Sequence, residues 1–291
     1  MDEPAFALRD ATVAIVGLGL MGGSLVLALR SRNACCRIIA ITSNAATRVQ
    51  VIARNIADEA SADLTRASSA DMIILAAPVR TIIAQLPRVG AIARVGAIVL
   101  DLGSTKREIV QVMEALPAHI QPIGGHPMCG KEKAGFGAAD ADLYRNAVFA
   151  LTPLARTSAQ TLALAKSLAE TIGARPLVLD PARHDRIAAA ISHLPYTLAT
   201  ALMLTADEFA GDDDLTFALA ASGFRDTSRL AASDTTMMLD ILLTNRENVA
   251  GLMRACSRRL DDLADLIAGG DETTLRARLE RAAAKRRELL K

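Results

Sequence analysis

The stretch TVAIVGLGLMGGSLVLALR, residues 12–30, decides the fold of this chain. An apolar run rich in β-branched residues leads into the spacing G-x-G-x-x-G, and a helical segment follows at once. At a strand-to-helix turn, the first glycine of this motif permits a tight turn, the second lets the backbone approach a pyrophosphate, and the third allows close helix packing. A helix that opens near Leu20 directs backbone N–H groups and its positive dipole end at the phosphates. The residues predicted to hold a dinucleotide here are Gly17, Gly19, Leu20, Met21 and Gly22.

Short apolar runs continue to alternate with helical stretches as far as Asp180. The runs are RIIAIT, MIILAA, AIVLDLG, AVFALTP (147–153) and RPLVLD (175–180). Their β-branched residues lack strict alternation, which is typical of strands covered on both faces, and the repeated strand–helix–strand order indicates a parallel sheet. We therefore expect residues 1–181 to form an α/β domain with a doubly wound parallel sheet.

Beyond Pro181 the chain changes to long stretches rich in Ala, Leu and Arg with helical periodicity. Pro181 is the best boundary because proline is awkward inside a continuing helix. Residues 182–291 are therefore predicted to form an all-α domain. Helices of this composition often bury an apolar stripe against a second subunit, which predicts a homodimer, with a monomeric bundle as the alternative.

Composition and charge exclude several other classes of protein. The 33 Lys and Arg against 32 Asp and Glu leave a formal charge of +1, which provides no basic field for nucleic acid. The four cysteines show no C-x-x-C pair and no histidine at zinc-ligand spacing, so no metal site is expected. No window of eighteen residues consists of apolar side chains throughout, and the N-terminus starts acidic where a signal peptide is basic. We expect a cytoplasmic protein that is not bound to a membrane.

The end of the run RIIAIT bears on the choice of dinucleotide. An NAD site normally places Asp or Glu there to bind the ribose hydroxyls, whereas this chain has Thr42. Hydroxyl groups from Thr42, Ser43 and Thr47 and the charge of Arg48 would suit a 2′-phosphate instead. NADP is therefore predicted as the cofactor, with NAD as the alternative. The alternative is that this segment is only a polar turn and that Arg48 is a solvated helix residue.

Two segments of the first half carry side chains suited to chemistry. DLGSTK (101–106) follows an apolar run, so Ser104 should lie at the carboxyl end of a strand, where open α/β sheets bind their ligands. GGHPMCG (124–130) presents His126 in what its glycines and proline predict to be a loop. An unperturbed histidine, with a pKa of about 6.5, is a proton acceptor at cellular pH. Ser104 and His126 are the predicted catalytic residues.

The helical half adds candidates for substrate binding. His193 lies just ahead of Pro195, and GFRDTSRLAASD (223–234) carries Arg225 and Arg229. Arginine can hold a carboxylate through two parallel hydrogen bonds, so both arginines are candidate anchors for an acidic small molecule. The alternative is that Arg225 pairs with the neighbouring Asp226 while Arg229 lies on a solvated face.

Taken together, these segments resemble the prephenate and arogenate dehydrogenases of tyrosine biosynthesis. The resemblance rests on VGLGLMGGSL (16–25), APV (77–79), DLGSTK (101–106), GGHPMCGKEKAG (124–135), LTP (151–153), HDRIAAAISHLPY (184–196), GFRDTSRLAASD (223–234) and an N-x-x-N-V segment ending at Val249. It implies a Rossmann-type domain followed by a helical dimerisation domain. It further implies oxidative decarboxylation of prephenate to 4-hydroxyphenylpyruvate, or of arogenate to tyrosine, with NAD(P) as the hydride acceptor.

The resemblance also implies roles for individual residues. His126 resembles the catalytic histidine that takes the proton of the ring hydroxyl, and Ser104 resembles the serine that holds this histidine and the hydroxyl. Arg229 resembles the arginine that binds the ring carboxylate, and His193 a histidine near the substrate's side chain. Arg225 is a weaker addition to the substrate site. Pro78, within APV, is assigned to the cofactor site.

Other functions remain alternatives at this stage. Arogenate differs from prephenate only by an amino group in place of the keto group, and no single residue decides between them; prephenate is favoured. A β-hydroxyacid dehydrogenase or an imine reductase would share the glycine turn and a helical second domain, but usually relies on a lysine there. A dinucleotide sensor without catalytic activity is a further alternative, disfavoured by the joint presence of Ser104, His126 and Arg229.

Overall fold

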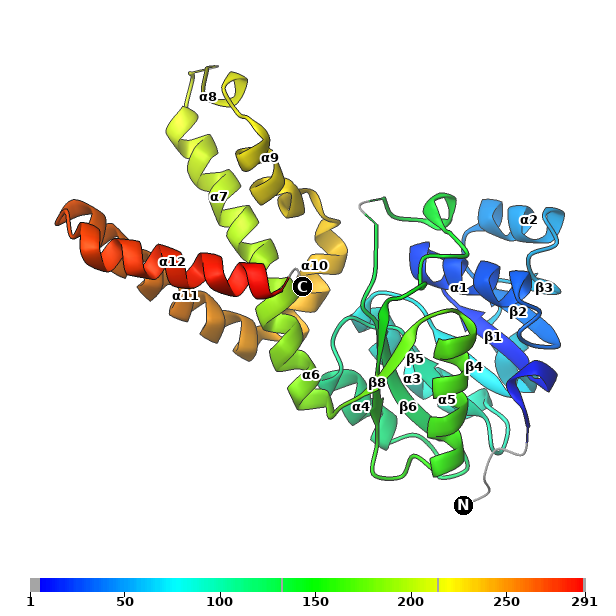
Figure 1. Ribbon diagram of the computed structural model, residues 1–291. Coiled ribbons are helices and arrows are strands. Elements are labelled where there is room, and N and C mark those ends of the chain that lie inside the picture. The colour runs from blue at the N-terminus through cyan, green and yellow to red at the C-terminus, as the bar shows by residue number, and fades with distance from the viewer. Residues whose placement is uncertain (1–5, 132, 214, 290–291) are drawn as a thin grey trace. The chain divides into compact units, whose positions relative to one another are not determined.

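The computed structural model describes residues 6–131, 133–213 and 215–289. Contacts within the chain define two compact units, one ending at Asn245 and one starting at Arg246. The first unit is built on one eight-stranded sheet with the order β3-β2-β1-β4-β5-β6-β7-β8 (Figure 1). The strands are β1 (Thr12–Val16), β2 (Arg37–Ile41), β3 (Glu59–Ser61), β4 (Met72–Leu75), β5 (Ile98–Asp101), β6 (Gln121–Pro127), β7 (Val148–Pro153) and β8 (Arg175–Val178). The order of the first six strands is that of a Rossmann-type nucleotide-binding domain.

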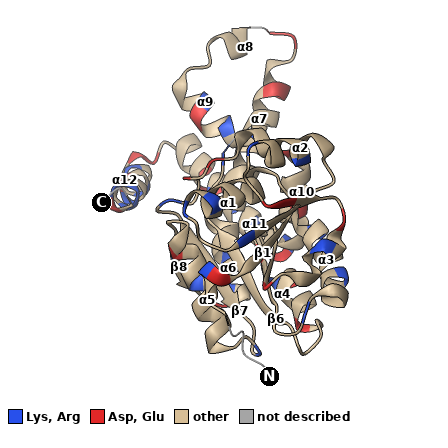
Figure 2. Ribbon diagram, turned by 90° about the vertical axis from the view of Figure 1, so that its right-hand side faces the viewer, with Lys and Arg blue, Asp and Glu red and all other residues tan. Residues whose placement is uncertain are grey.

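Helices cover both faces of this sheet, as the alternating runs predict. The helices up to the end of the sheet are α1 (Leu20–Ser31), α2 (Ala45–Ala53), α3 (Val79–Ile92), α4 (Arg107–Glu114) and α5 (Ala159–Thr171), with short 3-10 turns at Leu8–Asp10, Leu64–Ser69 and Phe136–Ala138. Figure 2 shows the charged residues on helices and connecting segments, while the strands are mainly free of charge.

The core consists of two apolar layers, one on each face of the sheet. Successive residues of β1 alternate between them: Val13 and Ile15 pack in the layer under α1 and α5, whereas Ala14 and Val16 pack in the layer under α3 and α4. Both layers are built from aliphatic side chains, with Tyr144 and Phe149 adding aromatic area to the first. The double coverage explains why the strands read as continuous apolar runs.

The expected doubly wound parallel sheet is found, with one exception in strand direction. β7 pairs antiparallel with β6, while the other neighbouring strands run parallel. In its described part, residues 128–131 and 133–147, the connection contains only a 3-10 turn and no crossover helix, so β7 starts at the same edge at which β6 ends. This connection is fastened to α1 because the Tyr144 hydroxyl donates to the Met21 carbonyl at 2.6 Å and the Ser24 hydroxyl accepts from the Asp140 amide at 2.9 Å.

After β8 the first unit continues as helices. They are α6 (Pro181–Ala188), a π-helical turn (Ala189–His193), α7 (Leu194–Ala210), α8 (Leu215–Ala218), α9 (Ser222–Ser228), a 3-10 turn (Arg229–Ala232) and α10 (Thr235–Thr244). Asp180 caps α6 by accepting from the Arg183 amide at 2.8 Å, and proline stands at the first helical position, where its missing N–H costs nothing. The predicted change to helix at Pro181 is therefore found, while the division of the chain into domains 1–181 and 182–291 stays a prediction.

Two carboxylates of this helical segment bind the sheet helices at their amino ends. Asp185 accepts from the Lys106 and Arg107 amides at 2.7 and 2.9 Å at the start of α4, and Asp240 accepts from the Arg80 amide at 3.1 Å in the first turn of α3. Neither helix has a side-chain cap from its own N-cap residue. Asp185 and Asp240 supply those caps from elsewhere in the chain, where the helix dipole favours negative charge.

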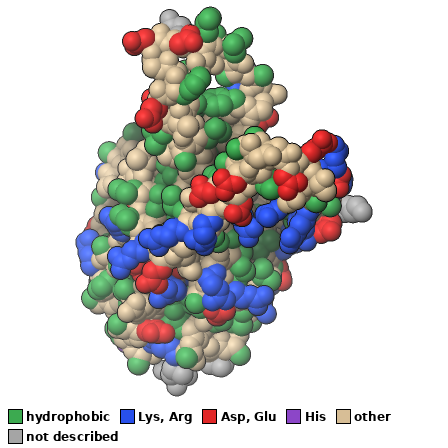
Figure 3. Space-filling model, turned by 90° about the vertical axis from the view of Figure 1, so that its left-hand side faces the viewer, with side chains coloured by type: hydrophobic (Ala, Val, Ile, Leu, Met, Phe, Trp, Pro, Cys, Tyr) green, Lys and Arg blue, Asp and Glu red, His purple; other side chains and the backbone are tan. Residues whose placement is uncertain are grey.

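The helix that runs from Pro181 to Ala210 is long and apolar enough to cross a membrane, judged by length and composition alone. Only 22% of its most apolar eighteen-residue window is buried within the chain. Such a helix is weak evidence for a membrane, because core helices of soluble proteins meet the same criterion. Figure 3 shows hydrophobic side chains exposed around α7 to α9, at the top of the view. Among the exposed large apolar residues of α7 and of the segment up to α9 are Leu204, Phe209 and Leu219, of which Phe209 is 83% exposed.

The second unit consists of α11 (Arg246–Ala268) and α12 (Glu272–Glu288). The two helices pack on each other, and Asp271 caps α12 by accepting from the Thr274 amide at 3.0 Å. Most side chains of α12 are exposed and charged. An all-α structure for the carboxyl-terminal part of the chain is therefore found in both units.

Candidate active site

The glycine turn has the backbone that its motif predicts. Gly17 has φ +99°, and a Cβ there would lie 2.5 Å from the Ala76 carbonyl oxygen. A Cβ on Gly22 would lie 1.9 Å from the Gly17 carbonyl oxygen, so α1 can approach the turn only without a side chain. A Cβ on Gly19, the N-cap of α1, would meet no atom within 4 Å. Close packing on two sides and open space at the helix amino end fit a dinucleotide pyrophosphate.

The other residues predicted for the cofactor lie at the same edge of the sheet. Leu20 and Met21 form the first turn of α1 and are half-buried, and Pro78 is the exposed N-cap of α3, just after β4. The carboxyl ends of β1 and β4 are neighbours in the sheet. The glycine turn and Pro78 are thereby brought close together by the strand order.

The turn after β2 positions the residues predicted for the ribose. Thr42 is half-buried and Ser43 exposed, whereas Thr47 is buried in the first turn of α2. The Arg48 guanidinium donates to the Thr42 and Ser43 carbonyl oxygens, both at 2.8 Å. Arg48 thus holds this turn and places positive charge beside it, with no acidic side chain at position 42.

His126 lies in a strand, which corrects the predicted loop. It is the second-last residue of β6 and pairs with Ala150 of β7. The preceding glycines serve close packing: a Cβ on Gly124 would lie 2.2 Å from Thr152 Oγ1, and one on Gly125 would lie 2.7 Å from the Asp101 carbonyl oxygen. Glycines that predict a loop therefore belong to a buried strand here.

Ser104 lies three residues after β5, and β5 pairs with β6. Both predicted catalytic residues are therefore at the carboxyl edge of the sheet, and both are half-buried. The hydrogen bond that orients the His126 imidazole comes from another residue, His184 of α6, at 2.9 Å between Nδ1 of His126 and Nε2 of His184. The role predicted for Ser104 stays a prediction.

Sequence reasoning missed a buried polar cluster around this imidazole. His184 Nδ1 lies 2.8 Å from Asp185 Oδ1, and the Asn245 amide donates to the Asp185 carbonyl oxygen at 2.7 Å. The same amide nitrogen lies 3.2 Å from Nδ1 of His193, which joins the second predicted histidine to the cluster. His184 and Asp185 stand in the segment HDRIAAAISHLPY, and Asn245 begins the N-x-x-N-V segment, but no local pattern in either indicates the pairing.

Burial keeps the two predicted histidines neutral. The pKa of His126 is well below its usual range because burial penalises the charged form, and the nearby His184, Lys106 and His193 lower it further. Burial lowers the pKa of His193 to about 4, with a smaller lowering by His184 and an opposing effect of Asp185. A neutral imidazole is the form that can accept a proton.

A fully buried ion pair, Lys106 with Asp101, lies next to the strand residue that precedes His126. The Lys106 ammonium binds the Asp101 carboxylate and donates to the Gly125 carbonyl oxygen at 2.5 Å, directly before His126. Asp101 also accepts from the Gly103 amide at 2.7 Å and the Gly125 amide at 3.1 Å. A buried charge pair needs such additional hydrogen bonds, and these tie the end of β5 to the end of β6.

The predicted arginines lie on the helical segment. Arg225 is in the last turn of α9 and Arg229 opens the following 3-10 turn, and both are exposed. Both elements pack against α7. Substrate binding by Arg225, Arg229 and His193 stays a prediction.

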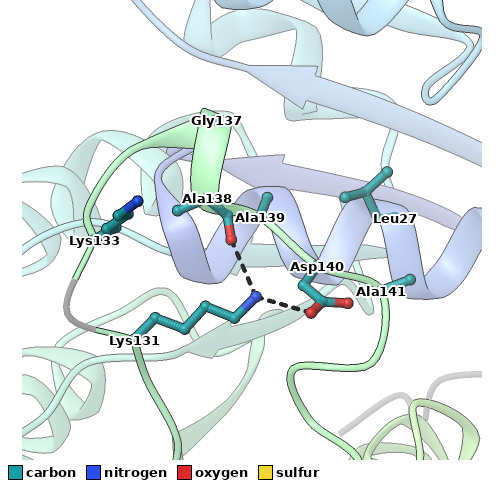
Figure 4. Close-up of a pocket in the computed structure, with 8 residues that line it drawn as sticks. All are labelled: Leu27, Lys131, Lys133, Gly137, Ala138, Ala139, Asp140 and Ala141. Carbon is teal, nitrogen blue, oxygen red and sulfur yellow. Dashed lines mark hydrogen bonds and ion pairs between the residues drawn. The ribbon is translucent and has the colours of Figure 1, made fainter.

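A shallow pocket beside α1 is separate from these residues. It is lined by Leu27 and by residues of the connection between β6 and β7, where Lys131 reaches Asp140 at 2.8 Å (Figure 4). No predicted site residue lines it. Within residues 6–131, 133–213 and 215–289, no group of three or more His, Cys, Asp or Glu side chains is arranged to hold a metal ion.

A nucleotide-binding sheet with a neutral histidine at its carboxyl edge defines a dinucleotide-dependent dehydrogenase. The comparisons with known proteins specify the family. The family model for the prephenate dehydrogenase nucleotide-binding domain matches residues 25–178, and the family model for the prephenate dehydrogenase dimerization domain matches residues 180–281. The chain belongs to the prephenate dehydrogenase family.

Individual relatives agree with this assignment. Prephenate dehydrogenase of Lactococcus lactis is 33% identical over 268 residues, which cover 90% of this chain and 73% of the relative. The crystal structure of prephenate dehydrogenase from A. aeolicus, in complex with hydroxyphenyl propionate and NAD+, is 32% identical with a TM-score of 0.89 and covers 96% of this chain and 98% of that one. The crystal structure of Synechocystis arogenate dehydrogenase is 31% identical with a TM-score of 0.82, covering 96% and 99%. A nicotinamide dinucleotide is thus the cofactor class.

Proposed function

We propose that this enzyme oxidises and decarboxylates prephenate to 4-hydroxyphenylpyruvate, with NADP as the hydride acceptor, in tyrosine biosynthesis. The observation that carries the proposal is the half-buried His126 at the carboxyl end of β6, on the edge of the sheet that also holds the glycine turn; burial lowers its pKa and so favours the neutral ring. Family membership supplies the substrate class, and the histidine supplies the base that the reaction needs.

The task of the protein is to position the reacting groups and to hold one proton. His126 accepts the proton of the ring hydroxyl, so that O–H breaks and N–H forms. A nicotinamide dinucleotide held at the turn of Gly17, Gly19 and Gly22 would supply the acceptor for the hydride from the ring carbon that bears this hydroxyl. The bond to the ring carboxylate then breaks, carbon dioxide leaves, and the electron pair makes the ring aromatic. The product oxygen recovers the proton, so the products are 4-hydroxyphenylpyruvate, carbon dioxide and NADPH.

Substrate recognition falls to the helical segment. Arg229 is assigned to the ring carboxylate, with Arg225 as a second cation and His193 near the side chain of the substrate. Arginine suits this role because it binds a carboxylate through two parallel hydrogen bonds. Ser104 is assigned to the ring hydroxyl, beside His126.

The preference for NADP rests on the turn after β2. Thr42 leaves no carboxylate to repel a 2′-phosphate, and Arg48 adds positive charge where it donates to the Thr42 and Ser43 carbonyls. The hydroxyls of Thr42 and Ser43 complete this part of the site, and Thr47 supports it from within α2. NAD is the alternative cofactor.

The exposed apolar side chains of α7 to α9 support a homodimer. Large apolar surface on a soluble chain marks an interface, and the dimerization-domain match includes these helices. We assign this surface to a second subunit rather than to a membrane, and the enzyme to the cytoplasm.

Arogenate is the second candidate substrate, because a related structure of the same fold is an arogenate dehydrogenase. A two-by-two assay decides between the candidates: prephenate or arogenate, each with NAD or NADP, followed by the absorbance of the reduced nicotinamide. We expect the highest kcat/KM for prephenate with NADP. Turnover of a 3-hydroxy acid in place of both substrates would overturn the proposal, as would dinucleotide binding without any turnover.

A further inference from the structure

The catalytic histidine has two ring nitrogens, and only the nitrogen without a proton can act as the base. The neighbours of His126 decide which nitrogen that is. Its Nδ1 is engaged by His184 at 2.9 Å, and the two rings meet edge to face with centroids 5.1 Å apart. The direction of this hydrogen bond therefore determines the chemistry of His126.

The direction of this hydrogen bond follows from the hydrogen bonds that Asp185 accepts. Both of its oxygens accept backbone N–H groups, from Lys106 at 2.7 Å and from Arg107 at 2.9 Å, at the positive end of α4. An ionised carboxylate held in this way can only accept hydrogen bonds. His184 Nδ1, 2.8 Å from Asp185 Oδ1, must consequently carry a proton and donate it.

The remaining steps follow from the number of protons on the His184 ring. When that ring carries one proton, the proton is the one that Nδ1 donates to Asp185, and the lone pair on Nε2 accepts. His126 Nδ1 must then be the donor, and Nε2 of His126 is left with the lone pair. The titratable groups that act on His126 are His184 from α6, Lys106 at the start of α4 and His193 from the π-helical turn, while Asp185 acts through its contact with His184. Lys106 is already paired with Asp101.

We propose that Asp185 and His184 are positioning residues that fix His126 in its Nδ1–H tautomer and make Nε2 the base of the reaction. The inference rests on the proposed function for the identity of that reaction, but the tautomer itself does not depend on the substrate. When Nε2 of His126 takes the hydroxyl proton, the ring becomes an imidazolium whose Nδ1–H points at a lone pair of His184. Asp185 then offsets the positive charge, as the orienting carboxylate of a catalytic triad does.

The tautomer can be read directly in solution because the chain has only four histidines. Long-range nitrogen–proton correlation spectra of the histidine-labelled, ligand-free enzyme at neutral pH report which ring nitrogen is protonated. We expect His126 and His184 as Nδ1–H tautomers. His193 serves as the internal reference, because the Asn245 amide donates to its Nδ1 and leaves the proton on Nε2. An Nε2–H tautomer of His126 in the wild-type enzyme would overturn the proposal.

Variants separate positioning from folding. In His184→Gln we expect His126 to lose its fixed Nδ1–H signal and kcat to fall by about 10²-fold, with the Kd for NADP changed by less than about threefold. In Asp185→Asn we expect the same loss of the Nδ1–H signal, the same fall in kcat and the same small change in the Kd for NADP. Its matched control is Asp240→Asn, which weakens the corresponding cap on α3 without touching a histidine. If Asp240→Asn alters the His126 tautomer as much as Asp185→Asn does, the effect is structural and the inference fails.

The same set distinguishes this inference from the proposed function. An enzyme that turns over neither prephenate nor arogenate, yet shows His126 as Nδ1–H, contradicts the function and supports the tautomer assignment. An active prephenate dehydrogenase in which His184→Gln retains the wild-type kcat and tautomer contradicts the inference alone. His184→Gln also covers the case in which Asp185→Asn does not fold.

Discussion

The carboxyl edge of the sheet has two parts that differ in how the protein equips them. After β1 the chain offers backbone and open space: a Cβ on Gly19 would touch nothing within 4 Å, and the neighbouring glycines exclude side chains. After β5 and β6 the same edge is filled with side chains that bind one another, from His126 through His184 to Asp185. The first part recognises a ligand by leaving room for it, while the second fixes its own groups in advance. The predictions below break or sharpen this contrast.

The largest effect is expected in the pre-arranged part. Replacing His126 with Asn removes the proposed base and should lower kcat by about 10²–10⁴-fold, while the Kd for NADP stays within about twofold. Steady-state kinetics and a separate NADP titration measure the two quantities. His119→Asn is the control, because His119 is exposed and precedes β6 at the opposite end. A His126→Asn enzyme as active as His119→Asn would remove His126 from the base role.

A second prediction concerns the free energy of unfolding and uses His193, whose pKa is lowered to about 4 by burial. Above about pH 6.5, the ordinary pKa of histidine, the ring is neutral in both the folded and the unfolded chain, so this histidine does not reduce the free energy of unfolding there. As the pH falls from about 6.5 towards 4, the unfolded chain binds a proton that the folded chain refuses, and stability is lost, in total on the order of 3 kcal/mol. Urea unfolding at about pH 7.5 and about pH 5 should show a smaller loss in His193→Asn than in the wild type. Equal losses in the two proteins would contradict the burial of a neutral His193.

The glycine turn allows a matched pair of substitutions in the open part. Gly22→Ala places a methyl group against the Gly17 carbonyl and should destabilise the fold by about 1–3 kcal/mol. Gly19→Ala meets no protein atom, so its unfolding midpoint should stay at the wild-type value while the Kd for NADP rises about tenfold. Thermal unfolding and NADP titration of both variants test the contrast. Unchanged NADP binding in Gly19→Ala would mean that the open space is not the pyrophosphate site.

The smallest effect is expected at the ribose. Thr42→Asp introduces a carboxylate that repels a 2′-phosphate and binds ribose hydroxyls, so the ratio of kcat/KM for NADP to that for NAD should fall by about tenfold. Thr42→Ser keeps a hydroxyl and should leave the ratio as it is. A ratio that does not respond to Thr42→Asp would contradict the assignment of NADP from this turn.

The comparison also explains what the sequence could predict. Gly17, Gly19 and Gly22 act through the backbone of one short turn, so their spacing alone indicates their role, and the apolar runs on either side identify the sheet. The direction of β7 was not encoded in its apolar run, because an apolar run reads the same in either direction. The signal lies in the connection between β6 and β7, whose described residues, 128–131 and 133–147, form no helix that returns the chain to the opposite edge.

His184, Asp185 and Asn245 escaped prediction because no local pattern joins them. Asn245 lies 60 residues beyond Asp185 in the sequence, and the π-helical turn that follows α6 ends at His193. In a regular helix, residues nine apart point in roughly opposite directions at about 100° per residue. The π-helical turn has more residues per turn and therefore changes the direction in which His193 points. The Asn245 amide nitrogen then lies within hydrogen-bond distance of both the Asp185 carbonyl oxygen and His193 Nδ1. The place of Ser104 could be predicted because an apolar run precedes it, whereas the strand that contains His126 could not, because Gly124 and Gly125 are typical of a loop.

The caps supplied by Asp185 and Asp240 have a consequence for how this protein can be divided. A fragment that stops after β8 would retain every strand, yet α3 and α4 would lose the carboxylates that receive their first amides. Truncation or domain exchange at Pro181 would therefore fray the two helices that start beside the reaction centre. We therefore expect the nucleotide-binding sheet to unfold cooperatively with the segment up to Asn245, because distant parts of the chain share these caps.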